Sequence, residues 1–226
     1  MKAVIVLPAY NEASVIRQVI ANLPKKLNGI SNLEYVVIND GSTDQTGEMV
    51  KKEGIKVLSH IINRGLGAAI KTGIDYAKSQ KADLLVTFDS DGQHNPRDLQ
   101  KVINPILQEK ADLVIGSRFK NYQKAPLDRL IINKLANLAT LVFFGVSTTD
   151  SQSGLRSFSK KALQFIDYRA DKMDFSSEIL LEAKRHNLKV SEVPIDLIYT
   201  QYSREKGQKN INSLSVFAKL LVRLYR

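Results

Sequence analysis

Two aspartates alternate directly after a run of apolar residues near the middle of the chain. Asp89 and Asp91 follow the apolar run 84–88, and Gly92 and Gln93 come next. Because glycine permits a tight bend, both carboxylates can turn toward one hard cation, with the Gln93 amide oxygen as a further ligand. A D-x-D-G string also forms ordinary turns, so the string alone leaves a metal site and a plain turn open.

Other sites built on paired acidic residues fit this loop less well. A calcium-binding EF-hand loop needs a third oxygen ligand before its glycine and a glutamate at the end of the loop, and the sequence around Gly92 has neither. A phosphatase with a nucleophilic aspartate normally carries that residue near the chain start. Asp89 instead follows what we expect to be the fourth strand, which disfavours this enzyme class.

Two further polar clusters resemble the first in their position along the chain. The string P-A-Y-N-E covers residues 8–12, and N-D-G-S-T-D covers residues 39–44. Each follows a short apolar run that we expect to be a strand. Since functional groups in an open α/β sheet collect at the carboxyl ends of its strands, we expect all three clusters to share one rim of the sheet.

A glycine-containing segment, 65–72, reads G-L-G-A-A-I-K-T and comes close to two phosphate-binding motifs. Ile70 stands where a P-loop needs its second glycine and where G-x-G-x-x-G needs its third, which disfavours a P-loop kinase or a dinucleotide enzyme. Gly65 and Gly67 can still bring the chain close to a helix start, where a phosphate could bind.

The elements that must position these residues follow from the hydrophobic pattern. In the first half, short apolar runs alternate with helical periodicity, which is typical of βαβ units and a mainly parallel sheet. The predicted strands are residues 3–7, 35–39, 55–59, 84–88 and 113–116. The predicted helices are residues 12–23, 43–53, 67–78 and 96–108. Ser42 and Gln45 have the spacing of a capping box, and Pro96 suits a first helical position.

The alternation stops after Arg118. An apolar helical segment is predicted over residues 130–144, followed by the polar turn D-S-Q-S-G at residues 150–154. A helix over residues 175–186 and a strand over residues 189–199 complete the expected elements. The fold class is therefore α/β, with one catalytic domain and a C-terminal extension.

Composition narrows the possible functions. The chain has 226 residues, no cysteine, three histidines and a formal net charge of +10. Without cysteine there is no disulfide and no thiolate ligand, which is compatible with a reducing compartment. The histidines His60, His94 and His186 are too scattered for a zinc site, and we interpret His94 as part of the acidic loop and the other two as incidental.

The positive charge favours a polyanionic partner: nucleic acid, anionic lipid or a phosphorylated substrate. Arg118, Arg129, Arg156 and the segment 204–209 supply basic groups in the second half. Single arginines are usually solvated surface charges. Together with a carboxylate metal site, however, these guanidinium groups suit a substrate with several phosphates.

Seven strings, in this order, resemble the family 2 glycosyltransferases, and among them most closely the dolichol-phosphate mannose synthase and polyprenyl-phosphate glycosyltransferase branch. The strings are L-P-A-Y-N-E, V-V-I-N-D-G-S-T-D, N-R-G-L-G-A-A-I-K-T-G, D-S-D-G-Q-H-N-P, G-S-R-F, D-S-Q-S-G-L-R, and E-V-P-I followed by R-E-K-G-Q-K. The resemblance covers residues 1–210 and implies a nucleotide-diphospho-sugar transferase fold of the GT-A type there; residues 211–226 are expected, from their own pattern, to form a C-terminal amphipathic helix.

The resemblance also implies roles for individual residues. The base and ribose of the nucleotide-sugar donor would be held by Pro8, Tyr10, Glu12 and Asp40. The ligands of Mg²⁺ or Mn²⁺ at the diphosphate would be Asp89, Asp91 and Gln93. Arg118 and Arg129 would meet the acceptor phosphate, while Arg204 and Lys209 would close over the diphosphates. Two departures, Asn133 and Gln208, stand where the family often has serine, so they bear on the acceptor side.

The expected activity is transfer of a mannose- or glucose-type sugar, with inversion, from a GDP- or UDP-sugar to a polyprenyl or dolichyl phosphate. An acceptor phosphate is already anionic and needs no general base. A saccharide or other hydroxyl acceptor, the alternative, would need one, for which Asp150, Asp174 and Glu178 are candidates. A nucleic-acid-binding module would explain the charge but would leave the acidic clusters without a purpose, so we expect no nucleic acid partner.

The C-terminal residues have an amphipathic pattern. Leu214, Phe217, Leu221 and Leu224 recur at helical spacing over residues 213–226, with basic residues on another side. This pattern suits either a helix resting on a membrane surface or one packed on its own domain or a second copy. No run approaches the length of a spanning helix, and the opening apolar run is too short for a secretion signal. We therefore expect a cytoplasmic protein, peripheral at the cytoplasmic face of a membrane.

Overall fold

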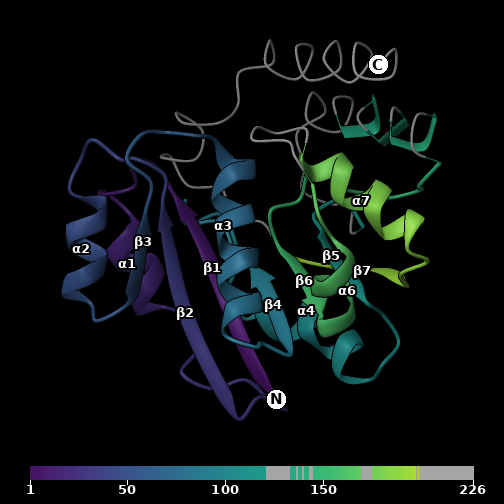
Figure 1. The fold of residues 1–226 in the computed structure, drawn as a ribbon, viewed down its shortest axis with the longest axis horizontal. Helices are drawn as coiled ribbons and strands as arrows, with labels where there is room; N and C mark the ends of the chain where they lie inside the picture. The colour runs from purple at the N-terminus through teal and green to yellow at the C-terminus, as the bar shows by residue number, and fades with distance from the viewer. Residues whose placement is uncertain are drawn as a thin grey trace.

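A twisted seven-stranded sheet forms the centre of the protein in the computed structural model, which describes residues 1–120, 133–135, 137–138, 140–142, 145–168, 175–196 and 198 (Figure 1). The strand order is β3-β2-β1-β4-β6-β5-β7. The strands are β1 (Lys2–Ala9), β2 (Asn32–Asn39), β3 (Lys56–Ser59), β4 (Leu84–Thr87), β5 (Leu113–Ser117), β6 (Arg156–Ser159) and β7 (Val190–Pro194).

Most strand pairs are parallel, which confirms the predicted fold class. β1 pairs with β2 and β4, β2 pairs with β3, and β5 pairs with β7, all in parallel. β6 is the exception because it runs antiparallel between β4 and β5. The sequence did not reveal β6: its first two residues, Arg156 and Ser157, are polar, yet they are only 1% and 0% exposed.

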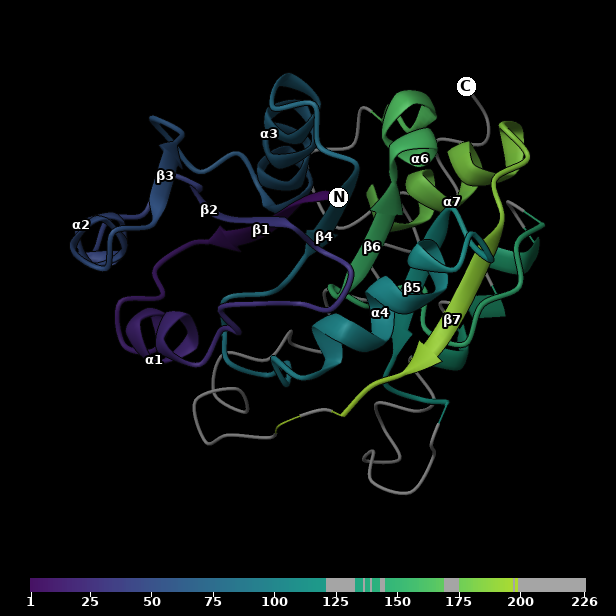
Figure 2. The ribbon, with the colours of Figure 1, turned by 90° about the horizontal axis from the view of Figure 1, so that it is seen from below.

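Helices cover both faces of the sheet (Figure 2). They are α1 (Ile16–Ala21), α2 (Thr46–Lys52), α3 (Leu66–Ser79), α4 (Asp98–Leu107), α6 (Lys160–Phe165) and α7 (Phe175–Arg185). Successive side chains of a strand point to opposite faces, and β1 accordingly contributes Val4 and Val6 to the core under α3, α6 and α7. Ile5 and Leu7 join the core under α1, α2 and α4.

Three predicted helices, α1, α2 and α4, begin later than expected, because the residues before them make other hydrogen bonds. α1 starts at Ile16 and not at residue 12, since Asn11 has a φ of 54° and the Glu12 carbonyl accepts the first turn's N–H groups. α4 starts at Asp98, so Pro96 lies in the preceding turn and its carbonyl accepts from the Leu99 N–H.

The predicted capping box of α2 does not form. Ser42 accepts a hydrogen bond from the Asn11 N–H at 3.0 Å, and Gln45 is the N-cap residue without a side-chain bond. The Asp44 carboxylate takes the capping role instead, accepting from the Thr46 N–H at 2.9 Å.

The second half agrees with the prediction in outline. Residues 133–135, 137–138 and 140–142 are helical, and α7 matches the expected helix, whereas β7 ends at Pro194 rather than at residue 199. Within the described ranges, no helix is long and apolar enough to cross a membrane. The predicted boundary at residue 210 and the predicted helix over 213–226 lie outside the described residues.

Candidate active site

The loops after β1, β2 and β4 meet at one rim of the sheet, as predicted. In the parallel register Ala9 lies beside Asn39, and Val6 lies beside Thr87. The backbone hydrogen bonds between β1 and β2 continue past the strand ends: the Asp40 N–H donates to the Ala9 carbonyl at 2.9 Å. The three polar clusters are therefore adjacent in space although the first begins at residue 8 and the third at residue 89.

Side chains from each loop support the backbone of its neighbour. The Asn11 side-chain oxygen accepts from the Thr43 N–H at 2.9 Å, and the Glu12 N–H donates to the Thr46 hydroxyl at 2.8 Å. The buried Ser90 hydroxyl donates to the Pro8 carbonyl at 2.6 Å. These bonds fix the segment that carries three predicted donor-binding residues: Pro8, which is buried, Tyr10, which is 42% exposed, and Glu12, which is 8% exposed.

Asp89 lies where several positive groups offset its burial. Its Oδ2 atom is 3.2 Å from His94 Nε2, and its side chain is 28% exposed. Burial acts to raise the pKa of this carboxyl, but the His94 hydrogen bond and the charges of Arg118 and Arg156 outweigh it, so the pKa lies below its ordinary value. Asp89 is therefore ionised at neutral pH.

Asp91 is in the opposite situation. Burial raises the pKa of Asp91 to about 6, and the negative charges of Asp89 and Glu12 contribute to the rise. The one hydrogen bond described for its side chain comes from the Gln93 N–H, at 2.9 Å from Asp91 Oδ1. Ionisation of Asp91 thus adds a negative charge near those of Asp89 and Glu12, and a bound divalent cation would offset this repulsion.

The residues present suit a hard cation. Asp89 and Asp91 supply two carboxylates at one strand end, the kind of ligand that Mg²⁺ and Mn²⁺ prefer, and no third histidine, aspartate or glutamate joins them among the described residues. Gly154 makes room for this arrangement, because a Cβ atom there would overlap the Asp89 carboxylate. The role of Gln93 as a ligand stays a prediction.

Asp40 is buried and organises the loop between β3 and α3. Its two oxygens accept from the Arg64 N–H at 2.9 Å and the Gly65 N–H at 2.8 Å, and His60 Nδ1 lies 2.6 Å away. His60 Nε2 lies 2.9 Å from the Thr72 hydroxyl on α3. The interpretation of His60 as incidental is therefore wrong, since it links β2, β3 and α3. The contact of Asp40 with the donor stays a prediction.

Arg118, at the end of β5, is positioned by a buried aspartate. Its Nε and Nη2 atoms each donate to Asp150 at 2.7 Å, and its backbone N–H donates to the same carboxylate at 3.0 Å. The Asp150 side chain is 0% exposed. This corrects the suggestion that Asp150 could act as a general base, because both of its oxygens are occupied and shielded from solvent.

The turn that carries Asp150 is held on two sides. Asn133 and Asn137 donate to the Thr149 carbonyl at 2.7 and 2.8 Å, and the Thr149 N–H donates to Glu192 on β7 at 2.7 Å. Asn133, which differs from the serine that the family often has there, thus holds this turn in place through its hydrogen bond to Thr149.

Arg156 is fully buried and does not face a substrate, which corrects its inclusion among the phosphate-binding arginines. Its guanidinium donates to the carbonyls of Ser151, Ser153 and Ser176 at 2.6, 2.9 and 3.1 Å. Burial lowers the pKa of Arg156 to about 10, so it stays charged at neutral pH. Sequence reasoning could not distinguish this arginine from a surface one, because the strand that contains it was not predicted.

Of the remaining predicted site residues, only Glu178 lies among the described residues. Arg129, Asp174, Arg204 and Lys209 lie outside the described residues. Glu178 lies in the first turn of α7.

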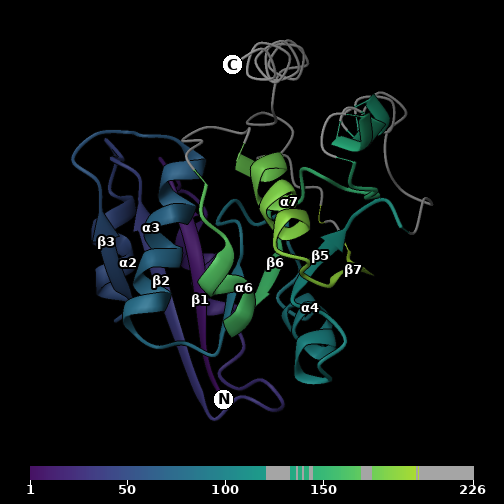
Figure 3. The ribbon, with the colours of Figure 1, turned by 45° about the vertical axis from the view of Figure 1, so that its right-hand side comes forward.

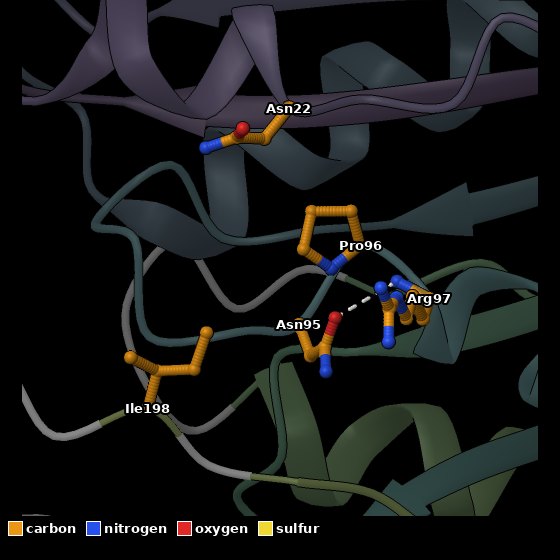
Figure 4. Close-up of a pocket in the computed structure, with 5 residues that line it drawn as sticks. All are labelled: Asn22, Asn95, Pro96, Arg97 and Ile198. Carbon is orange, nitrogen blue, oxygen red and sulfur yellow. Dashed lines mark hydrogen bonds between the residues drawn. The ribbon is translucent and has the colours of Figure 1, made fainter.

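A cavity of about 420 Å³ is lined in part by residues 95–97, which follow the acidic loop in the chain (Figure 4). Its lining consists of Asn22, Asn95, Pro96, Arg97 and Ile198. The Ile198 N–H donates to the Gln93 carbonyl at 2.8 Å, which ties the cavity wall to the loop. None of the predicted catalytic or donor-binding residues in the described part of the chain lines it.

Comparison with known proteins identifies the family and the fold of the chain. A family model described as glycosyl transferase family 2 matches residues 4–166, which include all three rim loops, Arg118 and Asp150. The chain belongs to this family. The structure of glucosyl-3-phosphoglycerate synthase from Mycobacterium tuberculosis superposes with a TM-score of 0.73 at 20% identity, over 99% of this chain and 78% of that one, and confirms the GT-A fold.

Several relatives are similar to this chain over nearly its whole length. An uncharacterized protein of Methanocaldococcus jannaschii is 45% identical over 96% of this chain and 90% of its own. The UDP-N-acetylglucosamine–dolichyl-phosphate N-acetylglucosaminyltransferase of Methanococcus voltae is 36% identical over 96% and 94%. The dolichol-phosphate mannosyltransferase of Pyrococcus furiosus is 28% identical over 100% of this chain and 63% of its own.

The buried guanidinium of Arg156 generates a stability prediction. Arg156→Met should lower the free energy of unfolding by about 3 kcal/mol, because three buried carbonyls lose their donor. The matched control is Arg17→Ala, which removes a side chain that is 66% exposed and should cost about 0.5 kcal/mol or less. Urea unfolding followed by circular dichroism measures both, and equal losses in the two variants would show that Arg156 does not hold the turn.

Asp91 generates a prediction about pH. A pKa of about 6 in the folded, cation-free protein lies above that of an unfolded aspartate, so the unbound protein loses stability as pH rises through 6. A cation binds the ionised carboxylate, and the rise in melting temperature caused by millimolar Mn²⁺ should therefore grow between about pH 5 and about pH 7. Asp91→Asn should remove this pH dependence. The same Mn²⁺ effect at both pH values in the unchanged protein would contradict the assignment.

Proposed function

We propose that the protein transfers a sugar from a nucleoside diphosphate sugar to a polyprenyl phosphate. The observation that carries the proposal is the carboxylate pair Asp89 and Asp91, set at the same rim as the arginine that Asp150 positions, Arg118. The first group suits the cation of a donor diphosphate, and the second suits an anionic acceptor. The printed activity of the Methanococcus voltae relative, transfer to dolichyl phosphate, supports this combination.

The donor would lie along the loops after β1 and β2. In the proposal, Pro8, Tyr10, Glu12 and Asp40 hold its base and ribose, and Asp89, Asp91 and Gln93 hold Mg²⁺ or Mn²⁺ at its diphosphate. The Mycobacterium tuberculosis synthase was crystallised with Mn²⁺ and UDP-glucose, which supports a divalent cation in this fold. Relatives are named for N-acetylglucosamine, glucose and mannose, so the donor is a UDP- or GDP-linked hexose.

The chemistry is a direct displacement. An oxygen of the acceptor phosphate forms a bond to the anomeric carbon while the bond from that carbon to the diphosphate oxygen breaks, and the electron pair leaves with the nucleoside diphosphate. The configuration at the anomeric carbon is inverted. A bound divalent cation would neutralise the charge that develops on the leaving group.

The protein's own groups orient the acceptor. A phosphate is anionic near neutral pH and needs no proton removed, which agrees with the observation that Asp150 is occupied by Arg118 rather than exposed as a base. The bidentate contact with Asp150 would hold the Arg118 guanidinium in one orientation toward the acceptor phosphate. By resemblance, Arg129 would share this task, and Arg204 and Lys209 would close over the diphosphate.

A lipid acceptor also implies a location. Polyprenyl phosphates reside in a bilayer with their headgroups at its surface, while nucleotide sugars are dissolved in the cytoplasm. The proposal therefore places the protein as a peripheral one at the cytoplasmic face of a membrane.

Transfer assays with a panel of donors test the proposal. With Mn²⁺ and UDP-N-acetylglucosamine, UDP-glucose or GDP-mannose, one donor should yield a glycosylated polyprenyl phosphate, and free mannose or glucose should not replace the lipid. Asp91→Ala should lower the rate about 100-fold or more, because it removes charge stabilisation of the leaving group. Asp75→Ala, which changes an exposed carboxylate on α3, is the control and should retain full activity. Transfer to free sugars alone, or undiminished turnover of Asp91→Ala, would contradict the proposal.

A further inference from the structure

Two adjacent isoleucines in the loop between β3 and α3 are exposed to an unusual degree. Ile61 is 100% exposed and Ile62 is 69% exposed, while most large apolar side chains of the described residues lie in the two cores. Single exposed apolar residues are common, but adjacent apolar side chains that are this exposed indicate a surface that binds a membrane, a ligand or another protein.

The loop cannot fold back to bury these side chains, because hydrogen bonds to the end of β2 and to the residue after it, Asp40, fix its backbone. The His60 N–H donates to the Asn39 carbonyl at 2.9 Å, and Asp40 binds the N–H groups of Arg64 and Gly65. The loop also lies directly on Gly41, where a Cβ atom would overlap the backbone of Ile62 and Asn63. The two side chains are therefore presented outward by a preformed loop.

A second exposed apolar group lies on the helical residues before the Thr149 turn. Its members recur at a spacing of three or four residues and so share one side of the helix. They are Leu135, Leu138, Leu141 and Val142, which are 56%, 56%, 46% and 67% exposed. Figures 1 and 3 both place this helical segment and the connection from β3 to α3 at the end of the molecule toward which β1 and β2 run.

Basic side chains accompany both apolar groups. Arg64 follows the isoleucines and Lys134 precedes Leu135, and both are exposed. The whole chain carries a net charge of +10. Apolar side chains bordered by cations match the boundary of an anionic bilayer, where the apolar groups enter between headgroups and the cations meet phosphates. Two copies of a chain with this net positive charge would instead repel each other.

We propose that Ile61 and Ile62, together with Leu135, Leu138, Leu141 and Val142, dock the protein on the surface of an anionic lipid bilayer. The proposal rests on the proposed function, since a polyprenyl phosphate must reach the rim that carries Asp91 and Arg118. Docking by this end of the sheet turns that rim toward the headgroups. A second copy seated on both apolar groups would cover the same rim and block it.

Vesicle cosedimentation tests the surface with three double variants of the full chain. Ile61→Ser with Ile62→Ser, and Leu138→Ser with Val142→Ser, should each weaken binding to phosphatidylcholine–phosphatidylglycerol vesicles at least about tenfold. The matched control is Phe165→Ser with Val190→Ser. These residues are 42% and 37% exposed, and Val190 pairs with Leu113 at the opposite end of the sheet. The control should bind like the unchanged protein.

Other occupants of the surface give different results. Unchanged vesicle binding by both docking variants overturns the proposal. So does a chain ending at Asn212 that loses all binding while the docking variants keep theirs, because residues 213–226 would then carry the membrane contact alone. A change of mass in sedimentation equilibrium, without a change in vesicle binding, would assign the surface to a second copy and overturn it as well.

Activity measurements separate this proposal from the proposed function. The Ile61→Ser, Ile62→Ser variant should keep its melting temperature and its rate with a water-soluble, short-chain polyprenyl phosphate, and should lose rate only with the acceptor in vesicles. If the unchanged protein transferred sugar to no polyprenyl phosphate but the docking variants lost vesicle binding, the function would fail and the docking surface would stand. Equal loss of rate with both acceptors would show that the loop acts in the site itself, against docking.

Discussion

Uncompensated negative charge at the end of β4 is the constraint on which the rest of the site depends. Asp89 and Asp91 form a pair of carboxylates at the same strand end, and the negative charge of Glu12 on the β1 loop contributes to the raised pKa of Asp91. Such a group is unstable in a partly buried place unless positive charge offsets it. For Asp89 the protein provides a hydrogen bond with His94 and the charges of Arg118 and Arg156, but it leaves Asp91 with a raised pKa.

This unequal treatment explains several features that otherwise look unrelated. Arg156 is buried, although burial disfavours its charge, because it supports Asp89 electrostatically and holds the turn at residues 151–153. Gly154, in the same turn, leaves the space that the Asp89 carboxylate fills. Asp150, at the start of the same turn, fixes Arg118, so one turn organises both the cation side and the acceptor side. A cation brought by a diphosphate would complete the charge balance at Asp91.

The central strands could be predicted because parallel strands buried on both faces appear as continuous apolar runs, as β1 and β4 do. Their carboxyl ends located the acidic clusters correctly. β6 could not be predicted, since Arg156 and Ser157 are buried by hydrogen bonds to distant carbonyls that no local pattern records. For the same reason His60 and Asp150 were misjudged: their roles come from partners 20 and 32 residues away in the chain, Asp40 and Arg118. The helix starts were misplaced because Asn11, Ser42 and Asp44 bond to other segments.

Calorimetric titration of the nucleoside diphosphate, UDP or GDP, with and without Mn²⁺ tests the central claim most directly. If Asp91 and the diphosphate bind the same cation, Mn²⁺ should increase the affinity for the nucleotide at least about tenfold. The nucleotide should then increase the affinity for Mn²⁺ by the same factor. Asp91→Ala should abolish this coupling while leaving weak binding of the nucleotide alone. Equal nucleotide affinity with and without Mn²⁺ in the unchanged protein, or undiminished coupling in Asp91→Ala, would contradict the account.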